Sequence, residues 1–125
     1  MRSSESREDY LEAILMLSEQ GDVHSIAIAN KLGVTKPSVS HAMKLLREGG
    51  YIKMDDDNHI TLTKTGRTIA EAVYSRHKTL MKLLMDMGVN EKTAFDDACK
   101  MEHDLSEESF NALCGLARAR GLSID

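Results

Sequence analysis

The 125-residue sequence has no tryptophan, a single proline, and only three tyrosines and two phenylalanines. This composition is untypical of an all-β sandwich and favours helices. The two cysteines, Cys99 and Cys114, are too few for a disulfide framework, so we expect a protein of the reducing cytoplasm. No apolar run reaches the roughly 18 residues of a membrane-spanning helix, and the first residues lack the apolar stretch of a secretion signal. The length allows one domain or two small units.

The formal net charge of −4 argues at first against a nucleic-acid partner. The charge is unevenly distributed, however, because residues 31–53 contain five basic residues and one acidic residue. The segments 1–21 and 86–125 are both acidic. Basic residues gathered in one stretch are typical of a DNA-binding face, so the net charge excludes no nucleic-acid partner.

Apolar residues at helical spacing, interrupted by glycines, predict six helices. We expect them over residues 6–20, 25–32, 35–48, 63–87, 91–103 and 106–118. Two short β-like runs, 51–54 and 59–62, flank a polar turn and predict a hairpin. Ser6 and Thr35 are expected to cap the first and third helices, and Gly33 to adopt a left-handed turn between the second and third.

Helix, glycine turn, basic helix and hairpin follow one another in the order of a winged helix-turn-helix. The second helix of such a unit presents small and polar side chains to DNA while its other face packs. Its lysines contact phosphates, and its hydroxyls add hydrogen bonds. The expected DNA-binding residues are Thr35, Lys36, Pro37, Ser38, Ser40, His41 and Lys44. Among them, His41 lies at the helix centre and is the expected base-edge contact.

The same helix could instead be an amphipathic surface helix with a solvated charged face. The hairpin that follows it and the basic stretch favour the DNA-binding interpretation. The turn of the hairpin carries three carboxylates at residues 55–57, which phosphate would repel. We therefore expect this wing to contact DNA at its flanks, through Lys53 or Lys64, or not at all.

Residue types that bind metals occur on three of the predicted helices. These residues are Asp9 and Glu12 on the first helix, His77 on the fourth, and Cys99, Glu102 and His103 on the fifth. Spacings of three and four residues place those of one helix on one face. Carboxylates, imidazoles and a thiol form a mixed hard and soft set that suits a divalent transition metal. Taken singly, they also have structural explanations, as a first-turn acid, core residues or exposed polar residues.

Five motifs in a fixed order strengthen this interpretation. They are residues 8–12 (EDYLE), 34–40 (VTKPSVS), 62–67 (LTKTGR), Arg76-His77 and the run from Cys99 to Ser106. Together they resemble the diphtheria toxin repressor and manganese transport regulator family. The resemblance implies a homodimeric winged-helix repressor that binds operators of metal-uptake genes when divalent iron or manganese is bound. Because the sequence ends after the predicted dimerisation helices, it resembles the short form without an SH3-like domain.

The resemblance also implies two domains and a dimer interface. Residues 1–66 are expected to form the winged helix-turn-helix, and residues 67–125 a helical metal-binding and dimerisation domain. The expected dimer contacts are Leu80, Leu83, Leu84, Phe110 and Leu113, with Met87 and Leu116 beside them. The same apolar residues could equally form the core of a single chain. Cys114 is expected to be a packing residue, because no metal-ligand type stands at helical spacing around it.

The ligands implied by the resemblance form a hybrid set. The manganese branch has Asp, Glu, His, Glu, Glu and His where this sequence has Asp9, Glu12, His77, Cys99, Glu102 and His103. The iron branch has Cys at the position of Cys99 but Met at that of Asp9, and its ancillary ligands are replaced here by Met81 and Phe95. A thiolate favours Fe²⁺, Co²⁺ or Zn²⁺, whereas the carboxylates keep the site hard enough for Mn²⁺. We therefore expect Fe²⁺ or Mn²⁺, with a slight preference for Fe²⁺.

Two other functions compete with this interpretation. A winged-helix regulator that responds to an organic ligand, or to none, would leave the acids and histidines solvated. A metalloenzyme would use a Cys/Glu/His site to activate water, but the sequence shows no nucleophile–base pair and no signature of a substrate pocket. We therefore expect a DNA-binding regulator that is not an enzyme and has no small organic substrate.

Overall fold

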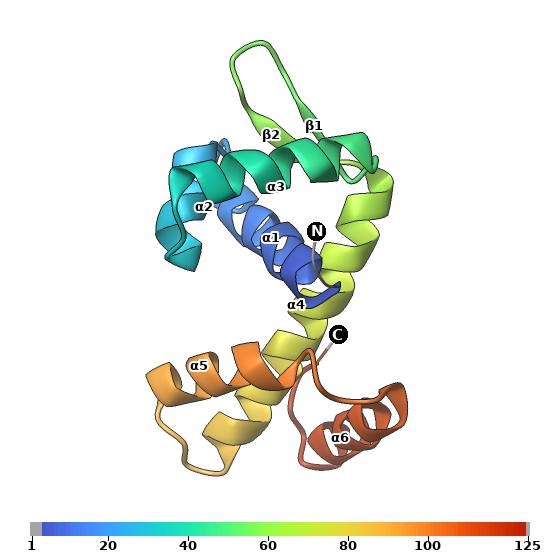
Figure 1. Ribbon diagram of the computed structural model, residues 1–125. Coiled ribbons are helices and arrows are strands. Elements are labelled where there is room, and N and C mark those ends of the chain that lie inside the picture. Colours follow the sequence, from blue (N-terminus) through green and yellow to red (C-terminus); the bar gives the residue numbers. More distant parts are fainter. Residues whose placement is uncertain (1–3, 125) are drawn as a thin grey trace. The chain divides into compact units, whose positions relative to one another are not determined.

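The computed structural model describes residues 4–124; the outermost residues of the two expected domains, 1–3 and 125, lie outside that range. Its elements are α1 (Ser4–Ser18), α2 (Ser25–Leu32), α3 (Lys36–Glu48), β1 (Ile52–Met54), β2 (Ile60–Leu62), α4 (Lys64–Asp86), α5 (Glu91–Met101) and α6 (Glu107–Ala119) (Figure 1). The predicted mainly helical class is confirmed. The chain forms two compact units, Met1–Glu71 and Ala72–Asp125, and α4 runs from the first into the second. Between residues 4 and 124, no helix combines the length and the apolar character needed to cross a membrane.

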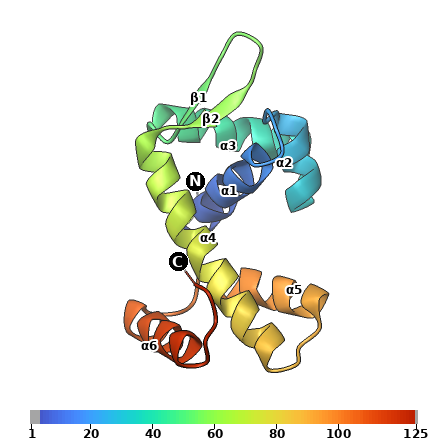
Figure 2. The ribbon, with the colours of Figure 1, turned by 180° about the vertical axis from the view of Figure 1, so that it is seen from behind.

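Unit 1 contains α1, α2, α3, the β-hairpin and the start of α4. Helix α2 packs against both α1 and α3, while β2 contacts α1 and β1 contacts α3. Figures 1 and 2 show the hairpin extending from one side of α3, with α1 on the other side. The largest buried side chains are Leu11, Ile14, Ile28, Val39, Met43, Leu46 and Ile52. This is the predicted winged helix-turn-helix.

Helix α1 is more completely buried than its sequence pattern suggested. It begins at Ser4, so the prediction that Ser6 caps it is wrong, and Ser6 lies inside the first turn. Leu11, Ile14 and Leu15 are all buried, although helical spacing from Ile14 does not place all three on one narrow stripe. A helix packed against both α2 and β2 buries more than one stripe, and periodicity alone detects a single buried face.

The turn between α2 and α3 has the predicted geometry. Gly33 has φ +66°, in the left-handed region, and its N–H donates to the carbonyl of Ala29. The Thr35 hydroxyl accepts a hydrogen bond from the backbone N–H of Ser38 (3.2 Å), and Pro37 occupies the first turn of α3. Both predicted signals are confirmed, because each depends only on local backbone geometry.

The hairpin is one residue shorter on each strand than predicted, with Lys53 opposite Thr61. Its turn is held by Asp55, whose Oδ1 accepts hydrogen bonds from the backbone N–H groups of Asp57 and His59 (both 2.9 Å). The backbone N–H of His59 is the main cause that lowers the pKa of the Asp55 carboxyl. Of the three wing carboxylates, that of Asp55 is therefore engaged in the hydrogen bonds that hold the turn.

Unit 2 contains the rest of α4, followed by α5 and α6. Asn90 caps α5 by accepting from two backbone N–H groups, and Ser106 caps α6 by accepting from that of Ser109 (3.0 Å). Helix α5 ends at Met101, earlier than the predicted 103, with Glu102 as its C-cap. The buried apolar residues are Val73, Leu80, Leu83, Ala94, Ala98, Cys114 and Ala117, which confirms Cys114 as a packing residue.

Gly66 lies near the start of α4, where an added Cβ atom would be 2.0 Å from the carbonyl oxygen of Tyr51. We expect Gly66→Ala to destabilise unit 1 by about 1–3 kcal/mol in urea unfolding, because the helix must move away from the hairpin. The control is Gly115→Ala on α6, where the added atom meets nothing within 4 Å. Its effect should be neutral or stabilising by up to about 1 kcal/mol, from helix propensity. Equal effects of the two substitutions would contradict the packing explanation.

Candidate metal centre and nucleic-acid interface

The predicted DNA-binding residues lie on the solvent-exposed side of α3 and its cap. All seven are exposed, namely Thr35, Lys36, Pro37, Ser38, Ser40, His41 and Lys44. The opposite side of the helix carries Val39, Met43 and Leu46 into the core. Arg47 is also exposed, one turn beyond Lys44, and extends the basic surface beyond the predicted set. Unit 1 therefore presents a polar and basic helix with a wing beside it.

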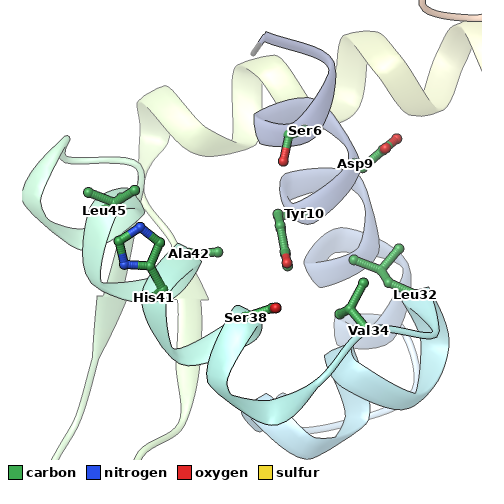
Figure 3. Close-up of a pocket in the computed structure, with 9 residues that line it drawn as sticks. All are labelled: Ser6, Asp9, Tyr10, Leu32, Val34, Ser38, His41, Ala42 and Leu45. Atoms are coloured by element: carbon green, nitrogen blue, oxygen red, sulfur yellow. The ribbon is translucent and has the colours of Figure 1, made fainter. Parts of the chain in front are cut away.

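A hollow of about 670 Å³ opens between α1 and α3 (Figure 3). Its lining residues are Ser6, Asp9, Tyr10, Leu32, Val34, Ser38, His41, Ala42 and Leu45. Burial, and next the charge of Asp9, raise the pKa of the Tyr10 hydroxyl. Sequence reasoning missed this hollow, because it forms only where α1 packs beside the α2–α3 turn. It brings the predicted ligand Asp9 and the predicted base contact His41 to one cavity.

Four of the six predicted metal ligands converge within unit 2. The His77 Nδ1 atom on α4 lies 3.3 Å from Glu102 Oε2 and 3.7 Å from Cys99 Sγ. The other carboxylate oxygen, Glu102 Oε1, lies 3.4 Å from His103 Nε2. The C-cap of α5 thus places its carboxylate between two imidazoles, and a thiol lies one helical turn before it.

The chemistry and burial of this cluster fit a divalent metal. The Glu102 side chain is fully buried, and those of His77 and His103 are 2 and 3 % exposed. A buried carboxylate is costly unless positive charge or hydrogen bonds accompany it. Two imidazoles, a carboxylate and a thiol are ligands that Fe²⁺, Co²⁺ and Zn²⁺ accept, and Mn²⁺ accepts the oxygen and nitrogen donors.

The other two predicted ligands lie on α1 of unit 1. Asp9 and Glu12 are three residues apart, and thus on one face of the helix. Asp9 is half-buried at the hollow described above, and Glu12 is 6 % exposed. Carboxyl groups so placed are not the solvated surface acids that the competing interpretation expected.

The predicted dimer residues divide into two groups. Leu80 and Leu83 are 2 and 4 % exposed in the single chain, so they belong to the core of unit 2. Leu84, Phe110 and Leu113 are half-buried. The large apolar side chains of unit 2 that remain exposed are Met85, Met87, Phe95 and Leu116, within the described residues. Periodicity cannot separate the two groups, because both require apolar residues.

Arg76 holds the connection between α5 and α6. Its Nη1 atom donates to the carbonyl oxygen of Leu105 (2.9 Å) and, at 3.4 Å, to that of Glu102. The guanidinium also lies over the Phe110 ring, 4.9 Å from its centroid. Sequence reasoning did not identify this role, and the adjacent position of Arg76 and His77 was its only signal. The residue fixes the backbone that carries Glu102.

An exposed basic helix with a wing, in a chain whose second unit gathers buried metal-ligand types, defines a class: a winged-helix DNA-binding protein with a helical metal-binding domain. The family models agree with this class. Residues 3–60 match the iron dependent repressor N-terminal DNA binding domain, and residues 63–118 match the iron dependent repressor metal binding and dimerisation domain. The chain belongs to the iron-dependent repressor family.

Named relatives agree with this assignment. The transcriptional regulator MntR of Salmonella typhimurium is 31 % identical over 94 % of this chain and 76 % of its own length. The diphtheria toxin repressor of Corynebacterium diphtheriae is 34 % identical over 83 % of this chain and 47 % of its own. A structure described as a manganese-dependent transcriptional repressor in complex with manganese superposes with a TM-score of 0.81, at 27 % identity, over 94 % of this chain and 53 % of that one. The predicted family is confirmed.

Arg76→Met should destabilise the protein by about 1–3 kcal/mol in urea unfolding, because two carbonyl groups lose a charged hydrogen-bond donor. The matched control is Arg118→Met on α6, whose exposed side chain makes no hydrogen bond or ion pair with residues 4–124. This control should change stability by less than about 0.5 kcal/mol. If both variants unfold alike, Arg76 has no anchoring role.

Proposed function

We propose that this protein is a metal-dependent transcriptional repressor that binds operator DNA as a homodimer when Fe²⁺ or Mn²⁺ is bound. Its targets would be metal-uptake genes. Because operator DNA lies in the cytoplasm of bacteria and archaea, we propose that the protein acts there. The observation that carries the proposal is the buried Glu102 carboxylate between His77 and His103, in a chain that also presents an exposed basic helix. Repression requires binding and release of DNA and no bond-making chemistry, so no enzymatic activity is proposed.

The proposal assigns one role to each part of the chain. Residues 1–66 would bind DNA and contribute two metal ligands from α1, and residues 67–125 would supply the other four ligands and form the dimer. Exposed Met85, Met87 and Leu116, with half-buried Leu84, Phe110 and Leu113, supply an apolar surface for the partner subunit. Leu80 and Leu83 support that surface from within the core.

The proposed metal ligands are Asp9, Glu12, His77, Cys99, Glu102 and His103. When bound, the ion supplies positive charge that compensates the buried carboxylates. Cys99 offers a single sulfur atom, so it cannot bridge two ions through separate atoms as a carboxylate does. The thiolate favours Fe²⁺ over Mn²⁺, and Co²⁺ or Zn²⁺ should also be accepted in vitro.

The proposed ligands couple metal binding to DNA binding because they come from both units. Asp9 and Glu12 belong to α1, which packs against the helix-turn-helix, and the remaining four ligands belong to unit 2. Shared coordination would fix the two α3 helices of the dimer at the spacing of successive major grooves, about 34 Å. Without the ion, the carboxylates of Asp9 and Glu12 on one face of α1 would repel each other. Coupling of this kind is typically worth about 1–3 kcal/mol.

Glu102→Gln should remove the metal dependence of DNA binding, because an amide lacks the charge that the cation requires. In a mobility-shift assay on a metal-transporter promoter, affinity should fall to the chelator level, roughly 5- to 150-fold. Fe²⁺ without oxygen, Mn²⁺, Co²⁺, Zn²⁺ and chelator are compared in parallel.

Glu108→Gln, at the exposed first turn of α6, is the control and should respond as the wild type does. Metal-stimulated binding that survives Glu102→Gln would refute the proposed site. Binding by the wild type that chelator leaves unchanged would instead support the constitutive or organic-ligand alternative.

Lys36→Ala and Lys44→Ala should weaken operator binding on all sequences, because both remove phosphate contacts. Each should reduce the slope of log affinity against log salt by about 1. Lys100→Ala, an exposed lysine on α5, is the control and should leave the slope unchanged. Unaltered slopes in both α3 variants would show that α3 does not lie against the DNA backbone.

A further inference from the structure

His59, at the root of the wing, has a carboxylate beside each of its ring nitrogens. Its Nδ1 atom lies 3.1 Å from Asp55 Oδ2, and its Nε2 atom lies 3.6 Å from Asp22 Oδ2. Asp22 belongs to the segment between α1 and α2, whereas Asp55 belongs to the wing turn. The imidazole therefore joins two loops of unit 1 that are distant in sequence.

A neutral imidazole ring cannot donate a hydrogen bond to both of these carboxylates. A neutral ring carries one N–H group, and donation to Asp55 leaves a lone pair on Nε2. That lone pair then faces the Asp22 carboxylate, which also carries negative charge. Two donors that each lie about 2.1 Å from a tetrahedral metal ion are roughly 3.4 Å apart, close to the spacing of Nε2 and Oδ2.

Asp55 is well placed to orient the ring. Its Oδ1 atom accepts two backbone N–H groups of its own turn, which fixes the carboxylate, and Oδ2 faces His59 Nδ1. A carboxylate that holds one nitrogen of a histidine while the other nitrogen binds metal is a recurrent second layer of metal sites. The wing turn thus supplies the support as well as the ligand.

His24 lies beside the His59 ring. Its ring packs edge-on against that of His59, with centroids 4.5 Å apart, and makes no capping hydrogen bond to α2 although it stands at the N-cap. To bind the same ion as His59, the His24 ring must rotate about its side-chain bonds. A hollow of about 220 Å³ borders Asp22 and His59; Arg67, which also lines it, has Glu71 within 3.8 Å.

We propose that Asp22, His24 and His59 form a second divalent-metal site, at the root of the wing, with Asp55 as its supporting carboxylate. Two imidazoles and a carboxylate suit a borderline ion such as Zn²⁺ or Co²⁺ better than Ca²⁺ or Mg²⁺. The ion would tie the wing to the segment before α2, reinforcing the hydrogen bond from the Ile60 N–H to the Val23 carbonyl (2.8 Å). The site lies wholly within unit 1 and is independent of the proposed regulatory site.

The test uses the full chain carrying Glu102→Gln, so that binding at the regulatory site is weakened. Zn²⁺ is titrated while the histidine ring signals are followed by NMR, and bound zinc is counted by equilibrium dialysis. We expect the His24 and His59 signals to move together on a single binding curve, while those of His41, exposed on α3, stay in place. His59→Gln and Asp22→Asn should each weaken this binding at least 10-fold.

A matched pair within the wing tests the supporting role. Asp55→Asn should weaken zinc binding about 10- to 100-fold, as loss of such a carboxylate typically does. Asp56→Asn, the neighbouring exposed carboxylate, should not. Circular dichroism confirms that each variant is folded.

Two results would overturn the proposal: zinc that binds equally well to His59→Gln, and ring signals that respond to pH alone and not to zinc. Neither result bears on the regulatory site, whose failure would appear as metal-stimulated DNA binding in Glu102→Gln.

Discussion

The carboxylate of Glu102, buried between the imidazoles of His77 and His103, is the interaction on which the rest of unit 2 depends. A carboxylate withdrawn from water keeps its charge only where cations or hydrogen-bond donors compensate the lost hydration. Helix α4 supplies one imidazole, and the end of α5 supplies the other together with the carboxylate. The packing of α4 against α5 therefore depends on how the negative charge of Glu102 is compensated.

Adjacent residues on α4 serve this arrangement in different ways. His77 contacts Glu102 and Cys99 directly, and its ring also packs edge-on against Phe95, 4.6 Å between centroids. Arg76 instead bonds the carbonyls that follow α5 and covers Phe110 on α6. Neighbouring positions on a helix point in directions about 100° apart, so a single turn of α4 reaches both neighbouring helices. Two adjacent residues of α4 thus position both the side chains and the backbone around Glu102.

In unit 1, the features expected to face DNA and those expected to face metal are close together. Asp9 on α1 and His41 on α3 line the same hollow, although the sequence separates them by an entire helix-turn-helix. Helix α2 packs against both α1 and α3, so it connects α1 to the helix that carries the basic side chains. This short path is the physical basis for expecting α1 ligands to influence DNA affinity.

The sequence alone determined the features that rest on local physics. The left-handed Gly33, the cap at Thr35 and the helical class follow from backbone hydrogen bonds within a few residues. The misjudged helix boundaries, Ser6 and the end of α5, lie at helix termini, where the ends fray and local signals define the boundary only to within one or two residues.

The metal-ligand types were visible in the sequence, and the family motifs placed them in order. Only the tertiary structure decided that His77 meets Glu102, that Leu80 and Leu83 are core residues, and that Asp22 reaches His59. Each of these contacts joins residues distant along the chain. Periodicity states which residues are apolar or polar, but the packing of whole helices and loops decides which neighbour each of them meets.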